Sequence, residues 1–117
     1  MGNNERRYAN QKHVRFETIP ESKNNSRVKF NRMALGQAVR SLSHSALKLY
    51  LYLEGFQNAE DGIYLSKQDA MKTVSVSEKS YFSAIKELRE KGYLVHAVNS
   101  EDKDAYVFHE KPEQEVG

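Results

Sequence analysis

Four histidines are the side chains of this 117-residue chain that could serve acid–base catalysis or metal binding near neutral pH. They are His13, His44, His96 and His109, and no two have the spacing of ligands on one helix. A hairpin centred on residues 102 and 103 would place His96 opposite His109, which gives two ligands where a tight zinc site needs more. The chain has no cysteine, which excludes thiolate ligands, thiol nucleophiles and disulfides. We therefore expect no metal site.

The serines, glycines and acids also lack the patterns of catalytic or nucleotide-binding sites. No serine lies in a nucleophile elbow, and Gly55 and Gly62 belong to neither a phosphate-binding loop nor a dinucleotide fingerprint. The adjacent acids at 60–61 and 101–102 fall in expected turns, where solvation explains them better than acid–base catalysis. We therefore expect no enzyme activity and no cofactor.

The charge is unevenly distributed along the chain. Residues 1–40 hold nine basic and three acidic residues, a net charge of +6, whereas residues 41–117 hold nine basic and thirteen acidic residues, a net charge of −4. This asymmetry is typical of proteins that bind a polyanion, because each cation that neutralises a phosphate releases a counterion. A solvated terminus without a partner would have the same composition.

The composition favours one small domain with a polar extension. The mean hydropathy of −0.79 is low for a globular chain, so part of the chain is expected to stay outside the core. The most apolar stretch, residues 47–56, contains Lys48 and Glu54 and is shorter than the roughly 20 residues that span a bilayer. The polar start has no secretory signal. We therefore expect a cytoplasmic protein without a membrane segment.

The elements that would position the charged side chains follow a polar segment. Residues 1–27 show no sustained periodicity beyond a short alternating run at 14–18, so we expect a flexible basic arm with at most one short strand. Apolar residues from Val28 onward predict that the folded domain begins there, with a short helix near 34–40.

Serines mark the starts of three further helices. Ser43 precedes a mostly buried helix that ends at Gly55, Ser66 a short helix to about residue 74, and Ser77 a helix over residues 78–91 that ends at Gly92. In the second helix, Asp69 would reach back to complete a capping box. Short strands are expected at 63–65, 93–98 and 105–109, the last two as a hairpin around a polar loop.

This order predicts an α+β fold of the winged helix-turn-helix type, with a three-helix core and the C-terminal β-hairpin as the wing. We expect a basic, flexible N-terminal arm over residues 1–27, the winged-helix domain over 28–112 and a frayed tail over 113–117. In such a fold one helix braces the next, whose polar face enters the major groove of DNA. A small α+β domain of no particular fold family would show the same elements.

Three runs carry a family resemblance: SLSHSALKLYLYL, GIYLSKQDAMKTVSVSEKSYFSAIKELREKGYLV and DAYVFHEKP. They resemble winged-helix domains of plasmid and phage replication-initiator and regulatory proteins, over roughly residues 28–112. The resemblance implies a double-stranded DNA-binding protein of mobile-element type, active in transcriptional regulation or DNA replication initiation. It includes no catalytic motif, and it does not decide between these processes.

The resemblance makes residues 78–91 the recognition helix, and it implies a set of DNA-binding side chains. On that helix Lys79, Ser80, Ser83 and Lys86 would face bases or phosphates, and Lys67 and Gln68 would bind phosphate at the start of the preceding helix. An ordinary solvated helix surface would also carry Lys67 and Gln68. Tyr81 could reach a phosphate, but its spacing to Ile85 and Leu88 favours the core.

The expected wing departs from the family pattern because its tip is acidic, with Glu101, Asp102 and Asp104 around Lys103. An acidic tip repels phosphate, so we expect the basic arm to contact DNA in its place. The arm residues nearest the domain are Arg27, Lys29 and Arg32, and those further out are Arg6, Arg7, Lys12 and Arg15.

The acidic wing also fits a second class of function. It could dock on a protein partner, in the manner of a phage-type inhibitor or a replisome adaptor. A single-strand or RNA binder fits less well, because most aromatic residues occupy core positions. The sequence does not decide whether the protein forms a homodimer, because no further amphipathic helix is present that would form a dimer interface.

Overall fold

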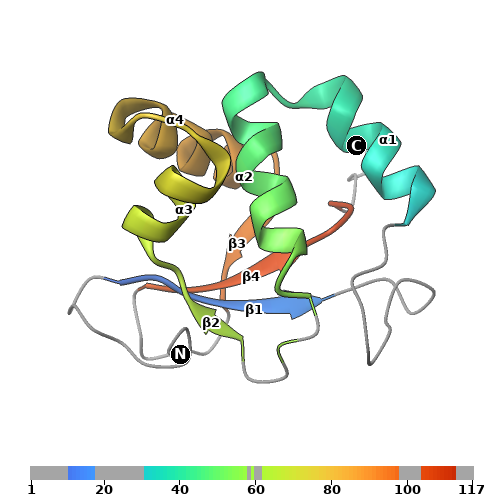
Figure 1. The fold of residues 1–117 in the computed structure, drawn as a ribbon. Coiled ribbons are helices and arrows are strands. Elements are labelled where there is room, and N and C mark those ends of the chain that lie inside the picture. The colour runs from blue at the N-terminus through green and yellow to red at the C-terminus, as the bar shows by residue number, and fades with distance from the viewer. Residues whose placement is uncertain (1–10, 18–30, 58, 60–61, 98–103, 113–117) are drawn as a thin grey trace.

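The computed structural model describes residues 11–17, 31–57, 59, 62–97 and 104–112. In this part of the chain, four helices lie on one side of a four-stranded sheet (Figure 1). The elements are β1 (His13–Glu17), α1 (Arg32–Ser41), α2 (His44–Glu54), β2 (Ile63–Tyr64), α3 (Lys67–Val74), α4 (Glu78–Glu90), β3 (Leu94–His96) and β4 (Ala105–His109). The mixed α+β class and the order of elements from α1 to β4 agree with the sequence-based expectation.

The sheet has the strand order β2-β1-β4-β3. The strands β3 and β4 form the expected antiparallel pair after α4. The strand β1 lies between β2 and β4, antiparallel to the first and parallel to the second. The amino-terminal strand β1 therefore joins β2 to the hairpin of β3 and β4 within one sheet.

The position of β1 corrects part of the expected domain organisation. Residues 13–17 fall within the segment 1–27 that was interpreted as a flexible arm, and they form an inner strand instead. The apolar members of the alternating run explain why a strand forms: Val14 is 0% exposed, and the ring of Phe16 packs 5.9 Å from that of Phe108. The expected boundary between residues 27 and 28, and the tail at 113–117, lie outside the described residues.

The core lies between the helices and the sheet, and α2 is its centre. Tyr50 of α2 is fully buried, with its ring 5.5 Å from the rings of Tyr93 and Phe108. The inner face of α4 supplies the residues expected from its periodicity, namely Tyr81, Ala84, Ile85 and Leu88. Tyr81 is therefore a core residue, as its spacing indicated.

Hydrogen-bonded caps fix where the helices begin. The side chains of Ser43, Ser66 and Ser77 each accept a hydrogen bond from a backbone N–H three residues on, which confirms the three expected caps. The expected capping box is wrong in one part, because the Asp69 carboxylate does not reach back to Ser66. It accepts a hydrogen bond of 2.5 Å from the Tyr52 hydroxyl, which ties α3 to α2.

Candidate nucleic-acid interface

A three-residue turn, Ser75 to Ser77, joins α3 to α4. Ser75 adopts the left-handed conformation, with φ 56° and ψ 60°, and caps the end of α3. Val76 packs against the core, and Ser77 begins α4. The turn sets the second helix across the first, so that α3 braces one side of α4 and leaves its outer side open.

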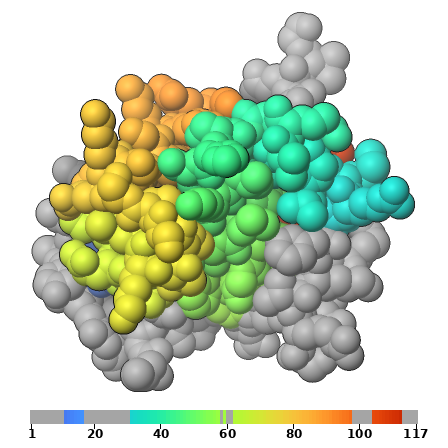
Figure 2. Space-filling view, turned by 45° about the horizontal axis from the view of Figure 1, so that its top comes forward, coloured from blue at the N-terminus to red at the C-terminus, as the bar shows by residue number. Residues whose placement is uncertain are grey.

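The outer face of α4 presents the side chains expected for a recognition helix. Lys79, Ser83 and Lys86 are exposed. They are four and three residues apart on α4, so their side chains share one surface of the helix. Ser80 is half-buried, and its hydroxyl lies 3.1 Å from that of Ser77. Figure 2 shows that α3 and α4 form one end of the helical layer, with α2 between them and α1.

Lys67 and Gln68 begin α3 beside the first turn of α4. Lys67 forms an ion pair with Glu78, the first residue of α4, and its Nζ lies 5.3 Å from the ring centroid of Phe82. The ion pair reduces the free positive charge of Lys67, whereas Gln68 is exposed. The start of α3 therefore adjoins the first turn of α4, and the phosphate contact expected of Lys67 and Gln68 stays a prediction.

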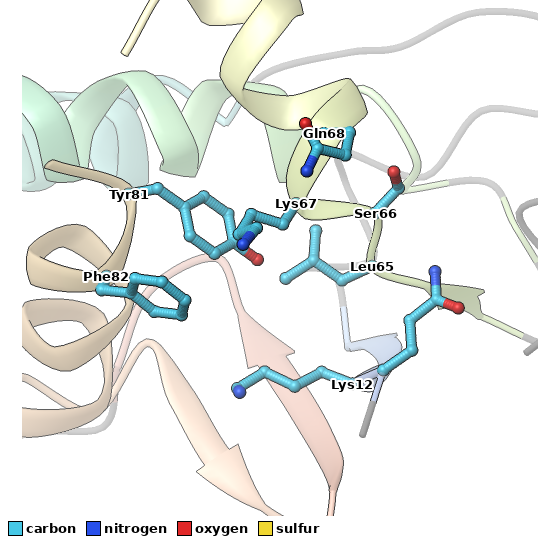
Figure 3. Close-up of a pocket in the computed structure, with 8 residues that line it drawn as sticks. Lys12, Leu65, Ser66, Lys67, Gln68, Tyr81 and Phe82 are labelled. Atoms are coloured by element: carbon cyan, nitrogen blue, oxygen red, sulfur yellow. The ribbon is translucent and has the colours of Figure 1, made fainter. Parts of the chain in front are cut away.

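A pocket of about 550 Å³ lies where β1, α3 and α4 meet (Figure 3). Its lining residues are Gln11, Lys12, Leu65, Ser66, Lys67, Gln68, Tyr81 and Phe82. The side chains of Lys12 and Lys67 both point toward the side of the pocket where Phe82 lies. Sequence reasoning assigned Lys12 to the outer arm and did not consider Phe82, so the pocket is a finding of the structure. The available signal was Phe82 itself, an apolar residue outside the inner stripe of α4.

A second group of cations continues along the side of α4 that faces the sheet. The Lys12 Nζ and the Arg89 guanidinium lie 6.0 and 5.5 Å from the ring centroid of Tyr106. Lys86 and Arg89 line a further hollow with Val95 of β3. We call Lys12, Lys67, Lys86 and Arg89 the basic flank; these cations border α4 at the start of α3, directly before β1 and beside β3.

Apart from Lys12, none of the expected arm residues that the structure describes lies on this surface. Arg32 begins α1, which α2 separates from α3 and α4 (Figure 2). Arg15 is exposed on β1. Arg6, Arg7, Arg27 and Lys29 lie outside the described residues, and so do the wing-tip residues Glu101, Asp102 and Lys103. Asp104 is half-buried directly before β4.

The histidine pairing considered for a metal site is wrong. The register of the hairpin sets His96 opposite Tyr106, and His109 lies further along β4. The described residues contain no group of three or more histidine, aspartate or glutamate side chains placed to hold a metal ion. Among α1 to α4, none has the length and apolar character needed to cross a bilayer.

Comparison with known families identifies the segment that carries this geometry. Residues 40–94 match the family model of a helix-turn-helix domain, and this range includes α2, α3, the turn and α4. The comparisons with curated proteins and with solved structures give no match. The two helices joined by the Ser75–Ser77 turn are thus the centre of a helix-turn-helix domain, and such a domain indicates DNA as the partner.

Proposed function

We propose that the chain is a sequence-specific double-stranded DNA-binding protein in which α4 enters the major groove. The observation that carries the proposal is the division of α4 into two faces. One face is buried against α2 and the sheet, and the other exposes Lys79, Ser83 and Lys86. An α-helix fits the width of the major groove, where lysine can donate to guanine acceptors and serine can donate or accept.

The basic flank supports a duplex as the partner. A helix in the major groove lies between two phosphate backbones, and cations beside it position the protein along them. Lys67 lies near the first turn of α4, whereas Lys12 and Arg89 both lie beside the Tyr106 ring, closer to the sheet. The hairpin of β3 and β4 would then act as the wing, with the domain belonging to the winged type.

The biological setting of the proposal rests on the resemblance of residues 28–112. We place the protein among mobile-element DNA-binding proteins that regulate transcription or initiate replication. It acts by binding and not by catalysis. The basic arm adds contacts through Arg6, Arg7, Arg27 and Lys29, in place of the acidic wing tip.

The experiment that tests the proposal is selection of bound sequences from a random duplex pool, followed by titration of the selected duplex. The double variant Lys79→Ala/Lys86→Ala is expected to lose at least about tenfold in affinity, with a salt dependence lower by about two counterions. Lys111→Ala removes an exposed lysine beyond β4 and serves as the control. A palindromic consensus would also report a homodimer.

Two outcomes would contradict the proposal. The first is equal affinity of the double variant and the control, because α4 would then not face the duplex. The second is no duplex binding at low salt together with stable capture of a protein partner. That result would favour the alternative, a protein–protein module acting through the acidic wing.

A further inference from the structure

Phe82 is an exposed aromatic residue on the helix that we place in the major groove. Its side chain is 52% exposed, although its neighbour Tyr81 is buried. It follows Lys79 by three residues and precedes Lys86 by four, so these three side chains share one side of α4. The hydrophobic core therefore does not account for this ring.

The ring is held in place by its two neighbours. Its edge-to-face contact with Tyr81 has a centroid distance of 5.4 Å, and the Lys67 ammonium lies 5.3 Å from its centroid. Lys67 in turn is ion-paired with Glu78. These contacts restrict the ring while about half of its surface stays open, at the edge of the pocket in Figure 3.

The chemistry of the major groove limits what this ring can contact. Base edges in that groove present hydrogen-bond donors and acceptors, and the apolar group among them is the 5-methyl group of thymine. A ring set against a donor or acceptor would remove its water without replacing the hydrogen bond, which costs free energy. A ring set against the methyl group would remove apolar surface from water on both sides.

We infer that Phe82 is a specificity-determining residue that reads a thymine methyl group in the major groove. The inference rests on the proposed function, since it requires α4 to face base edges. It adds to that function a preference for thymine at one or two positions of the target, set by an apolar contact and not by a hydrogen bond.

The test replaces each thymine of the selected duplex, one at a time, with deoxyuridine, which differs by the loss of that methyl group. The wild-type protein is expected to bind about three- to tenfold more weakly at one or two positions, the factor for one buried methyl group. Phe82→Ala should bind the thymine duplex more weakly and show no preference between the two bases there. Phe82→Leu should keep part of the preference. Leu51→Ala, which shortens a 39%-exposed side chain on α2, is the matched control and should behave as wild type.

The failure of the inference and the failure of the proposed function are distinguishable. Duplex binding without any thymine preference over deoxyuridine would overturn the role of Phe82 and leave the proposed function standing. Full thymine preference in a folded Phe82→Ala variant would overturn it as well. Absence of duplex binding by the wild-type protein would overturn both.

Discussion

Glu87 of α4 accepts two hydrogen bonds from Ser43, the residue that caps α2. The Ser43 backbone N–H lies 2.8 Å from Oε2 of Glu87, and the Ser43 hydroxyl lies 2.6 Å from Oε1. Lys91 forms an ion pair with the same carboxylate at 3.2 Å. Glu87 therefore fastens α4 to the start of α2.

We expect Glu87→Ala to lower the free energy of unfolding by about 1 kcal/mol near neutral pH, because it removes a charged acceptor from a partly exposed cap. Partial burial alone would raise the pKa of Glu87, but the Ser43 hydrogen bonds and the Lys91 charge hold it below its usual value. A lowered pKa in the folded state means that this stabilisation is present above the unfolded pKa of about 4.3. It is lost as the pH falls through the folded value.

Denaturant unfolding at pH 6 and pH 3 measures this effect. The difference between wild type and Glu87→Ala should shrink at pH 3, whereas Glu90→Ala, an exposed site on the same helix, should change little at either pH. A difference of equal size at both values would show that the carboxylate charge is not involved.

Glu54 is expected to make the free energy of unfolding fall as the pH rises, which is opposite to the effect of Glu87 and occurs at higher pH. It is 0% exposed at the end of α2, and burial, with the adjacent Glu110 carboxyl, raises the pKa of Glu54 to about 8. The folded protein then keeps a proton that the unfolded chain releases, so the free energy of unfolding falls as the pH rises from about 5 to 8. We expect a decrease of about 2 kcal/mol or more over this range.

Glu54→Gln is the variant that isolates this carboxyl group. The amide that replaces the carboxyl is neutral at all these pH values and can both donate and accept hydrogen bonds. The variant should therefore lose most of the decrease and be more stable than wild type at pH 8. Thermal or denaturant unfolding at pH 5, 6.5 and 8 measures this. Parallel curves for the two proteins would assign the pH dependence to another group.

Local signals predicted the helical part of the fold because the interactions that set it are local. The caps at Ser43 and Ser77 depend on residues three positions away, and Gly92 ends α4 with a positive φ of 85°. The exposed face of α4 follows from its periodicity. These features were enough to predict that Lys79, Ser83 and Lys86 are exposed on that helix.

Contacts between distant segments were not predictable in the same way. His13 pairs with Ala105 in a parallel register, and no local pattern specifies a partner so far along the chain. The same pairing brings Lys12 to the pocket beside Phe82. Asp69 shows that a tertiary contact can take the place of a local one. Its carboxylate accepts a hydrogen bond from Tyr52 and does not complete the expected capping box.

Substitution of two glycines, Gly62 and Gly36, tests the packing of β1 against the loop that precedes β2. Gly62 has a φ of 76°, and a Cβ atom there would lie 2.3 Å from the carbonyl oxygen of Val14. Gly62→Ala should therefore destabilise the protein by about 2 kcal/mol or more, through backbone strain and displacement of β1. Gly36 lies inside α1, where a Cβ would meet only the flexible end of Arg40, so Gly36→Ala should be neutral or stabilising.

Unfolding of the two alanine variants by heat or denaturant measures the contrast. A Gly62→Ala protein as stable as wild type would show that β1 does not lie against this loop. The comparison matters for function, because β1 carries Lys12 into the basic flank.

The next prediction concerns two cations, Lys12 directly before β1 and Arg15 within it. Lys12 lines the pocket beside α3 and α4, whereas Arg15 is exposed and, by strand alternation, points away from the side that Val14 and Phe16 share with the helices. Lys12→Ala should weaken binding to the selected duplex and lower its salt dependence by about one counterion. Arg15→Ala should leave both quantities close to wild type.

Deletion of residues 1–10 completes this comparison, because it removes Arg6 and Arg7 but leaves β1 intact. Removal of residues 1–27 would also remove an inner strand, so loss of DNA binding could then result from unfolding. The shorter deletion should keep the melting temperature and reduce the salt dependence by up to about two counterions. If neither the deletion nor Lys12→Ala changes the salt dependence, the segment preceding β1 has no contact with phosphate, and the affinity must come from cations elsewhere in the chain.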